Sequence, residues 1–192
     1  MSNFDGTLFV DRLFEDLELH AADLTGKEFE RCTFRRCKLP ESRWANARLE
    51  DCVFEACDLS RMVPRRMVLS GVRFADTRLS GVDWEDLGLL PDVSFAGCDL
   101  RYASFVKVPL RAVRFVNCVI RDASFVDSDL TKADFTDTDL TGTSFRGCLL
   151  KEANLTRATG VYVDPQQNRA KGARISLEAA VTLVRSFGIV VE

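Results

Sequence analysis

Seven cysteines are the side chains of this sequence with the widest chemical repertoire, because thiolates can bind metals, form disulfides or act as nucleophiles. Several of them recur at one interval: in the pairs Cys32 and Cys52, Cys37 and Cys57, and Cys98 and Cys118, the second cysteine is the twentieth residue after the first. Their chemistry depends on the elements that carry them, so the repeat that sets this interval has to be identified first.

Catalytic chemistry has little support elsewhere in the sequence. His20 is the single histidine, and a role on the surface or in a cap is favoured over catalysis. The sequence contains no phosphate-binding loop, dinucleotide fingerprint, serine-hydrolase elbow or zinc-protease motif. Carboxylates are plentiful, but they follow a regular outward pattern. We therefore expect no enzyme activity, no cofactor and no metal site.

Composition narrows the class of protein further. The 192 residues are 46% hydrophobic and 29% charged, which is typical of a folded globular chain. The net charge of −3 argues against a generally basic surface, so we expect no direct binding to nucleic acid. No apolar run approaches the roughly 18 residues of a membrane span, and no signal peptide is visible. These features predict a cytoplasmic protein with no membrane contact.

A large apolar residue occurs at every fifth position from Leu24 to Trp84 and again from Phe95 to Leu155, with Pro64 as the exception. One extra residue is inserted within Glu85–Asp92. If each large residue is position i, then i−2 is also small or apolar, and all seven cysteines stand there. Neither a helix nor a flat strand produces this pattern. A five-residue unit with two inward side chains suits a short extended side followed by a corner.

Four such corners close a square coil made of four pentapeptides. Glycines recur at i+2, where a turn requires a positive φ angle. Every twentieth residue then forms a ladder, and one ladder is purely aromatic: Phe34, Phe54, Phe74, Phe95, Phe115 and Phe135. Cysteines on the same ladder should stack on adjacent coils as small buried hydrophobes. Their separation would permit disulfides, but a cytosolic location argues against them.

These repeats resemble the pentapeptide-repeat family, whose consensus is A-[DN]-L-x-x. The match is closest in Ala133-Asp134-Phe135-Thr136-Asp137 and in Ala153-Asn154-Leu155-Thr156-Arg157, and the resemblance extends over residues 22–160. It implies an all-β solenoid, the right-handed quadrilateral β-helix of that family, here with a short C-terminal α-helix.

Both ends depart from the repeat. Residues 1–21 are expected to form a degenerate N-terminal cap coil, 22–160 the β-helix with a small bulge near 85–92, and 161–192 a C-terminal cap. Ser176 is a candidate N-cap of a helix, and Gly188 should follow its end. One apolar stripe is predicted on this helix, and it either covers the end of its own rod or also joins a second copy. The candidate dimerisation residues are Leu177, Ala180, Val181, Val184, Phe187 and Ile189.

Outward residues are the remaining candidates for function. Basic residues cluster around Arg61–Arg78, whereas acidic residues dominate later in the chain. This surface is either an ordinary solvated exterior or an anionic zone for a partner. The candidate partner-binding residues are Glu85, Asp86, Asp99, Asp122, Asp127, Asp129, Asp134, Asp137 and Asp139.

Runs such as Gly81-Val82-Asp83-Trp84 and the ending Ile175–Ile189 are similar to one subgroup of the family, the quinolone-resistance (Qnr) proteins and the albicidin and microcin immunity proteins. That similarity implies a homodimer joined at the C-terminal ends, which protects type II topoisomerases, DNA gyrase above all, from poisons by partial DNA mimicry. The low net charge and the short insertion depart from the subgroup. The alternative is a cytoplasmic scaffold that binds an unidentified protein partner.

Overall fold

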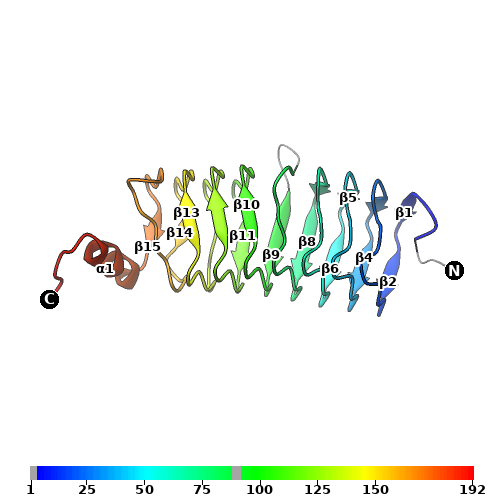
Figure 1. The fold of residues 1–192 in the computed structure, drawn as a ribbon, viewed down its shortest axis with the longest axis horizontal. Helices are drawn as coiled ribbons and strands as arrows, with labels where there is room; N and C mark the ends of the chain where they lie inside the picture. Colours follow the sequence, from blue (N-terminus) through cyan, green and yellow to red (C-terminus); the bar gives the residue numbers. More distant parts are fainter. Residues whose placement is uncertain (1–3, 88–91) are drawn as a thin grey trace.

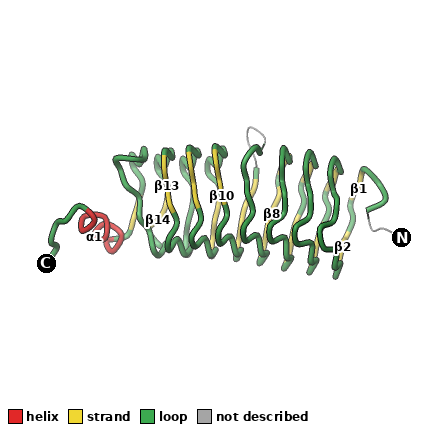
Figure 2. Tube along the Cα trace, in the orientation of Figure 1, coloured by secondary structure: helices red, strands yellow, loops and turns green. Residues whose placement is uncertain are grey.

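The computed structural model describes residues 4–87 and 92–192. Over these residues the chain winds into a parallel β-solenoid of about eight coils, the right-handed quadrilateral β-helix that the family resemblance implies, and one helix stands beyond the last coil (Figures 1 and 2). The two termini lie at opposite ends of the rod. Part of the predicted bulge near 85–92 falls on residues 88–91, which lie outside the described residues.

Three sides of the square carry ladders of short parallel strands, and the fourth is paired by isolated bridges such as Lys38 with Asp58. One sheet contains β1 (Leu8–Val10), β3 (Glu28–Glu30), β5 (Arg48–Glu50) and β7 (Val68–Ser70). A second, here called the Phe side, contains β2 (Leu13–Glu15), β4 (Thr33–Arg35), β6 (Val53–Glu55), β8 (Val72–Ala75), β9 (Val93–Ala96) and β11 (Arg114–Val116). Two short strands, β14 (Asn154–Leu155) and β15 (Arg174–Ile175), pair near the C-terminal end. The side opposite the Phe side, here called the Trp side, contains β10 (Ser104–Val106), β12 (Ser124–Val126) and β13 (Ser144–Arg146).

Pairing between coils confirms both the predicted period and the single insertion. Phe54 pairs with Phe74, its twentieth successor, whereas Phe74 pairs with Phe95, one position further along the chain than the period alone would give. Strands β1 and β2 pair with β3 and β4 in the regular register. Residues 8–15 therefore already belong to the ladders.

The core is made by the inward positions i and i−2, as the sequence predicts. Consecutive rings of the aromatic ladder stack with centroids 4.5 to 5.3 Å apart from Phe14 to Phe135. Phe105, Phe125 and Phe145 form a second stack on the Trp side, and their rings are nearly perpendicular to the neighbouring rings of the first stack. Offset stacking and edge-to-face contacts are the favoured geometries of aromatic pairs, so the two ladders interlock along the rod.

The corners are left-handed at i+2, and glycine is not required there. Positive φ angles occur at the predicted glycines, such as Gly142, but also at non-glycine residues in the same position, such as Arg36 at φ 50° and Asp122 at φ 54°. A left-handed conformation costs an L-residue roughly 1–2 kcal/mol. The stacked coils therefore impose this conformation whatever side chain is present.

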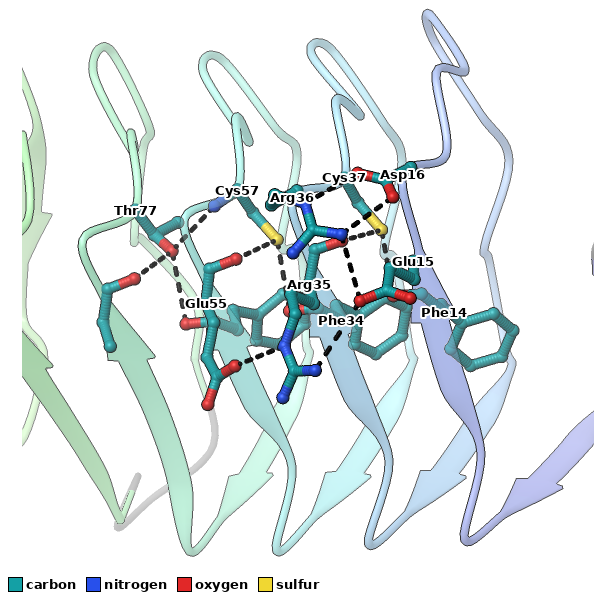
Figure 3. Close-up of polar contacts among 12 residues, drawn as sticks. Phe14, Glu15, Asp16, Phe34, Arg35, Arg36, Cys37, Glu55, Cys57 and Thr77 are labelled. Carbon is teal, nitrogen blue, oxygen red and sulfur yellow. Dashed lines mark hydrogen bonds and ion pairs between the residues drawn. The ribbon is translucent and has the colours of Figure 1, made fainter.

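The cysteines are free and buried at i−2. Their thiols also donate hydrogen bonds: Cys57 Sγ lies 3.3 Å from the carbonyl oxygen of Phe34 and 3.4 Å from that of Glu55 (Figure 3). On the next coil the hydroxyl of Thr77 donates to the equivalent carbonyls of Phe54 and Ala75. Position i−2 thus accommodates a small side chain that donates a hydrogen bond, although alanine and valine also occupy it, as at Ala47 and Val72.

The C-terminal helix α1 (Leu177–Ser186) begins where the sequence predicts. The Ser176 hydroxyl accepts the backbone N–H of Ala179 at 3.1 Å, and Gly188 follows the end of the helix with φ 77°. Ala179 is buried against the end of the rod, and Leu183, one turn later, is half-buried. Neither residue belongs to the predicted stripe. The stripe lies on the adjacent faces of the helix.

Candidate interaction surface

Aspartates at i−1 form part of the corners. Asp129 Oδ1 accepts the backbone N–H of Thr131 at 3.0 Å, and Asp139 makes the same bond to Thr141. Asp99 and Asp134 act likewise toward the residues two positions later. Short acidic side chains favour such local turns because they satisfy a backbone N–H that the corner leaves free. Four of the candidate partner-binding residues therefore have a structural role.

The charge of these corner aspartates is stabilised as well. Burial raises the pKa of Asp139, but hydrogen bonds from Thr141 and Arg121 outweigh it, so the pKa is lowered overall. In Asp99 the hydrogen bond from Arg101 is the largest cause, and it lowers the pKa. Both carboxylates are thus held in the charged form.

Asp122 and Asp127 occupy i+2, where they contact the coil that follows. The Oδ1 atom of Asp122 lies where a Cβ on Gly142 would stand, and Asp127 has the same relation to Gly147. Glycine at these two positions leaves space for the carboxylate of the preceding coil. These two aspartates have no salt bridge within the described part of the chain.

Most of the late acidic residues are neutralised by arginines. Asp129 pairs with Arg111 at 3.1 Å, and Asp139 pairs with Arg121 at 2.6 Å. Asp137 pairs with Arg157 at 2.7 Å, and Asp99 with Arg101 at 2.6 Å. Asp134 accepts a hydrogen bond from the amide of Asn154 at 2.9 Å. Four residues of the predicted anionic zone are therefore members of ion pairs.

Opposite charges also stack along the N-terminal half of the rod. Arg36 pairs with Asp16 on the preceding coil at 2.8 Å, and Arg35 bridges Glu15 at 3.6 Å and Glu55 at 2.8 Å (Figure 3). Sequence reasoning missed these pairs. The signal that could have found them is an acid and a base in the same outward position of successive coils.

Glu85 and Asp86 lie beside the basic cluster in a surface groove of about 780 Å³. This groove brings together the two interruptions of the repeat, Pro64 and the residues before the insertion, because they occupy successive coils of the Trp side. Neither Glu85 nor Asp86 forms a salt bridge within the described residues. The lining residues are Arg61, Met62, Val63, Pro64, Arg65, Arg66, Gly81, Asp83, Glu85, Asp86, Leu87, Val106 and Lys107.

The C-terminal end carries an exposed apolar patch. Leu177 and Val190 are 82% and 81% exposed, and Phe187 and Ile189 are about half exposed. Of the other stripe residues, Ala180, Val181 and Val184 are half-buried. An apolar patch on one end of a rod is typical of an interface with another protein.

Two further observations concern only residues 4–87 and 92–192. No group of three or more histidine, cysteine, aspartate or glutamate side chains could hold a metal ion there. The helix found in this part of the chain lacks the length and the apolar character needed to cross a membrane.

Comparison with known proteins agrees with this architecture. The family model described as the pentapeptide repeat region matches residues 27–91 and 89–163. The quinolone resistance pentapeptide repeat protein QnrB96 of Scandinavium goeteborgense is 27% identical over 116 residues, which are 55% of this chain and 54% of that protein. The match thus spans about half the length of this relative.

Solved structures share the whole rod. Trypsin-treated QnrB1, a plasmid-mediated fluoroquinolone resistance protein, superposes with a TM-score of 0.62 and 21% identity, covering 96% of this chain and 98% of that one. HetL, a pentapeptide repeat protein involved in heterocyst differentiation regulation in the cyanobacterium Nostoc, has a TM-score of 0.50 at 20% identity, covering 86% and 88%. At these identities the structures show a common fold. With the family model matching most of the coils, the chain belongs to the pentapeptide-repeat family.

Proposed function

We propose that this protein protects a type II topoisomerase, DNA gyrase in the first place, from a quinolone-like poison. The observation that carries the proposal is the sequence match to a quinolone resistance protein. QnrB1 has the same rod over almost its full length, which supports the proposal because the two proteins share one scaffold. The rod acts by binding, since its interior is filled with side chains. The proposed location is the cytoplasm, where the topoisomerase is.

DNA mimicry in this protein would be partial. Among the predicted acidic residues, Asp122, Asp127, Asp134, Glu85 and Asp86 form no salt bridge among the described residues. Asp134 accepts hydrogen bonds from the side chains of Thr136 and Asn154, so the other four are the carboxylates most available to a basic groove. Asp99, Asp129, Asp137 and Asp139 would have to give up an arginine first, and Asp134 would have to release Asn154. We propose that the binding surface centres on Asp122, Asp127, Glu85 and Asp86.

We also propose a homodimer joined through the C-terminal ends. The exposed patch of Leu177, Phe187, Ile189 and Val190 supports it, because these side chains lie outside the contact that α1 makes with its own rod. A second copy would cover them and would double the length of the rod.

A second candidate function is a scaffold that binds a different protein. The internal pairing of Asp99, Asp129, Asp137 and Asp139 favours it, since a surface neutralised by its own arginines is a weak imitation of DNA.

A supercoiling assay tests the proposal directly. Purified protein should restore supercoiling by gyrase in the presence of ciprofloxacin. The Asp122→Asn, Asp127→Asn double variant should protect less, whereas Glu28→Gln with Glu50→Gln, acids near the other end that have no salt bridge among the described residues, should protect normally. No protection by the wild type at any excess would reject the topoisomerase role and leave the scaffold.

A further inference from the structure

The Trp side has a break in its backbone ladder at Pro64. Elsewhere on this side the central residue donates its N–H to a carbonyl of the following coil, as Trp44 does to Val63 at 2.9 Å. Pro64 has no N–H to donate, so the carbonyl oxygen of Asp83 receives no backbone hydrogen bond from it.

The neighbouring bond of the same rung is missing too. The backbone N–H of Arg43 donates to the carbonyl oxygen of Ala22 at 2.9 Å, and that of Val63 donates to Ser42 at 2.8 Å. The next bond of the series, from the N–H of Asp83 to the carbonyl oxygen of Met62, is not formed. The bridges on this side stop at Val63 and resume at Asp83. One N–H and two carbonyl oxygens of this rung therefore have no backbone partner among the residues that the structure describes. The coils stay in contact at the corner, where the backbone N–H of Arg66 donates to the backbone carbonyl oxygen of Asp86 at 3.0 Å.

Met62 and Asp83, which carry the free backbone groups, are both lining residues of the groove of about 780 Å³ described above. Its volume is within the range of specific binding sites, but its lining is mainly charged and polar. Val63 and Leu87 contribute limited apolar surface. This is the lining expected for a polar, extended ligand.

Three cations of the groove are unpaired. Arg65, Arg66 and Lys107 form no salt bridge with any described residue, and the sequence places no charged residue among 88–91. Arg61, by contrast, is bound to Glu41. Elsewhere an arginine can pair with the acid at the same position of the neighbouring coil, as Arg36 does with Asp16. Arg65 and Arg66 stand in that relation to Glu85 and Asp86 and do not pair.

We propose that this groove docks an extended acidic segment of a partner protein. The guanidinium groups of Arg65 and Arg66 suit carboxylates, which they can bind through two hydrogen bonds each, and Lys107 adds a third positive charge. The free N–H of Asp83 and the free carbonyls match the alternating donors and acceptors of a peptide backbone. Asp83, Glu85 and Asp86 also line the groove and would repel a continuous polyanion such as a nucleic acid, so the occupant that fits is a protein segment whose acidic residues are separated by neutral ones. This inference does not rest on the topoisomerase proposal.

Fluorescence anisotropy with a labelled peptide in which glutamate alternates with serine tests the site on the full-length protein. The Arg65→Glu, Arg66→Glu double variant should bind this peptide about tenfold more weakly or worse, because it places like charges opposite the ligand. Arg48→Glu is the matched control, an arginine on another side of the rod that has no salt bridge among the described residues, and its affinity should be unchanged. Circular dichroism establishes that each variant is folded.

Pro64→Ala tests the backbone part without changing any charge. The alanine N–H can donate to Asp83, so the rung should close and the affinity for the acidic peptide should fall. A peptide in which lysine replaces glutamate should not bind. Equal binding by the charge-reversed variant and the wild type, or unchanged affinity after Pro64→Ala, would overturn the proposal. So would complete competition by equimolar inorganic pyrophosphate, which would indicate a simple anion site.

Discussion

The carboxylate of Asp122 fills the space beside Gly142, one coil further on, that the Cβ of any other residue would need. The same relation joins Asp127 to Gly147 and, earlier in the rod, Asp51 to Gly71. Across the insertion it joins Asp76 to Gly97. These glycines therefore leave space for a carboxylate of the preceding coil and also adopt the left-handed conformation of their own corner.

Gly142→Ala should destabilise the rod more than Gly26→Ala. Both glycines have a left-handed φ, so both substitutions incur the same strain of roughly 1–2 kcal/mol. Gly26 has no atom within 4 Å of the added Cβ, whereas Gly142 has the Asp122 carboxylate. The clash should add about 1–3 kcal/mol to the free energy lost, measured by urea denaturation.

Asp122→Ala in the Gly142→Ala background provides the matched control. Removal of the carboxylate should recover most of the additional loss and leave only the strain of the corner. Equal destabilisation of Gly26→Ala and Gly142→Ala would show that the Asp122 carboxylate on the preceding coil can move away at no cost.

The five-residue period predicted most of this fold because the spacing of the inward residues determines where each residue lies in its coil. The aromatic ladder from Phe34 to Phe135, the inward cysteines and the Ser176 cap all follow from positions along the chain. The face of α1 that contacts the rod was harder to predict from the sequence. Ala179 makes this contact although Val181 and Val184 are larger, because the docking angle of the helix decides which residue meets the last coil.

The surface was harder to predict than the core. The sequence shows that acidic residues are frequent around Asp129 and Asp139, but it does not show their partners. Those partners are Arg111 and Arg121, which form ion pairs with them from the preceding coil. The groove arises from the absence of backbone bonds at Pro64 and Asp83, and no single residue signals its volume.

Trp44→Phe should destabilise the protein more than Trp84→Phe. Trp44 donates its indole N–H to the Ser42 hydroxyl at 2.8 Å, whereas the buried indole nitrogen of Trp84 has no hydrogen-bond partner among the described residues, with Val82 at the equivalent position. Both substitutions remove similar apolar area, but only the second removes an unsatisfied donor. The two losses should differ by about 1–3 kcal/mol in chemical denaturation. Equal losses would indicate that Trp84 is satisfied in solution.

Asp23 should contribute to stability at neutral pH and lose that contribution in acid. Hydrogen bonds from Thr25 and Arg43 lower its pKa from 3.8 to about 2. Because the folded-state pKa lies below the unfolded value, the contribution is complete above that value and disappears as the pH falls toward 2. Asp23→Asn keeps an acceptor for Thr25 but does not titrate.

The difference in stability between wild type and Asp23→Asn should therefore shrink between about pH 5 and pH 2 in urea titrations. The effect should be small, since the side chain is 53% exposed and solvent screens its charge. A difference that grew in acid would contradict the assigned direction of the pKa shift.

The cysteines should react slowly with thiol reagents in the folded protein. Burial raises the pKa of Cys52 to about 11, so its reactive thiolate is scarce at neutral pH and is also inaccessible. Mass spectrometry after brief labelling at pH 8 should find most thiols unmodified until a denaturant is added. Rapid native labelling of several cysteines would reject their role as buried packing groups.

Phe187→Asp should convert the proposed dimer into a monomer without unfolding the rod. Phe187 is about half exposed at the C-terminal end, beside the exposed Ile189, and its side chain lies outside the buried contact of Ala179. A charge there would be costly inside an apolar joint but harmless on a free surface. Light scattering at micromolar concentration should report twice the chain mass for the wild type and one chain mass for the variant.

The matched control is Leu8→Asp, an equally exposed apolar residue at the N-terminal end, which should leave the dimer intact. Circular dichroism and the melting temperature should be unchanged in both variants, because neither side chain belongs to the core. A wild type that is monomeric at these concentrations would reject the C-terminal dimer. If Phe187→Asp is monomeric and still protects gyrase as well as the wild type, then assembly and protection are separate properties of the rod.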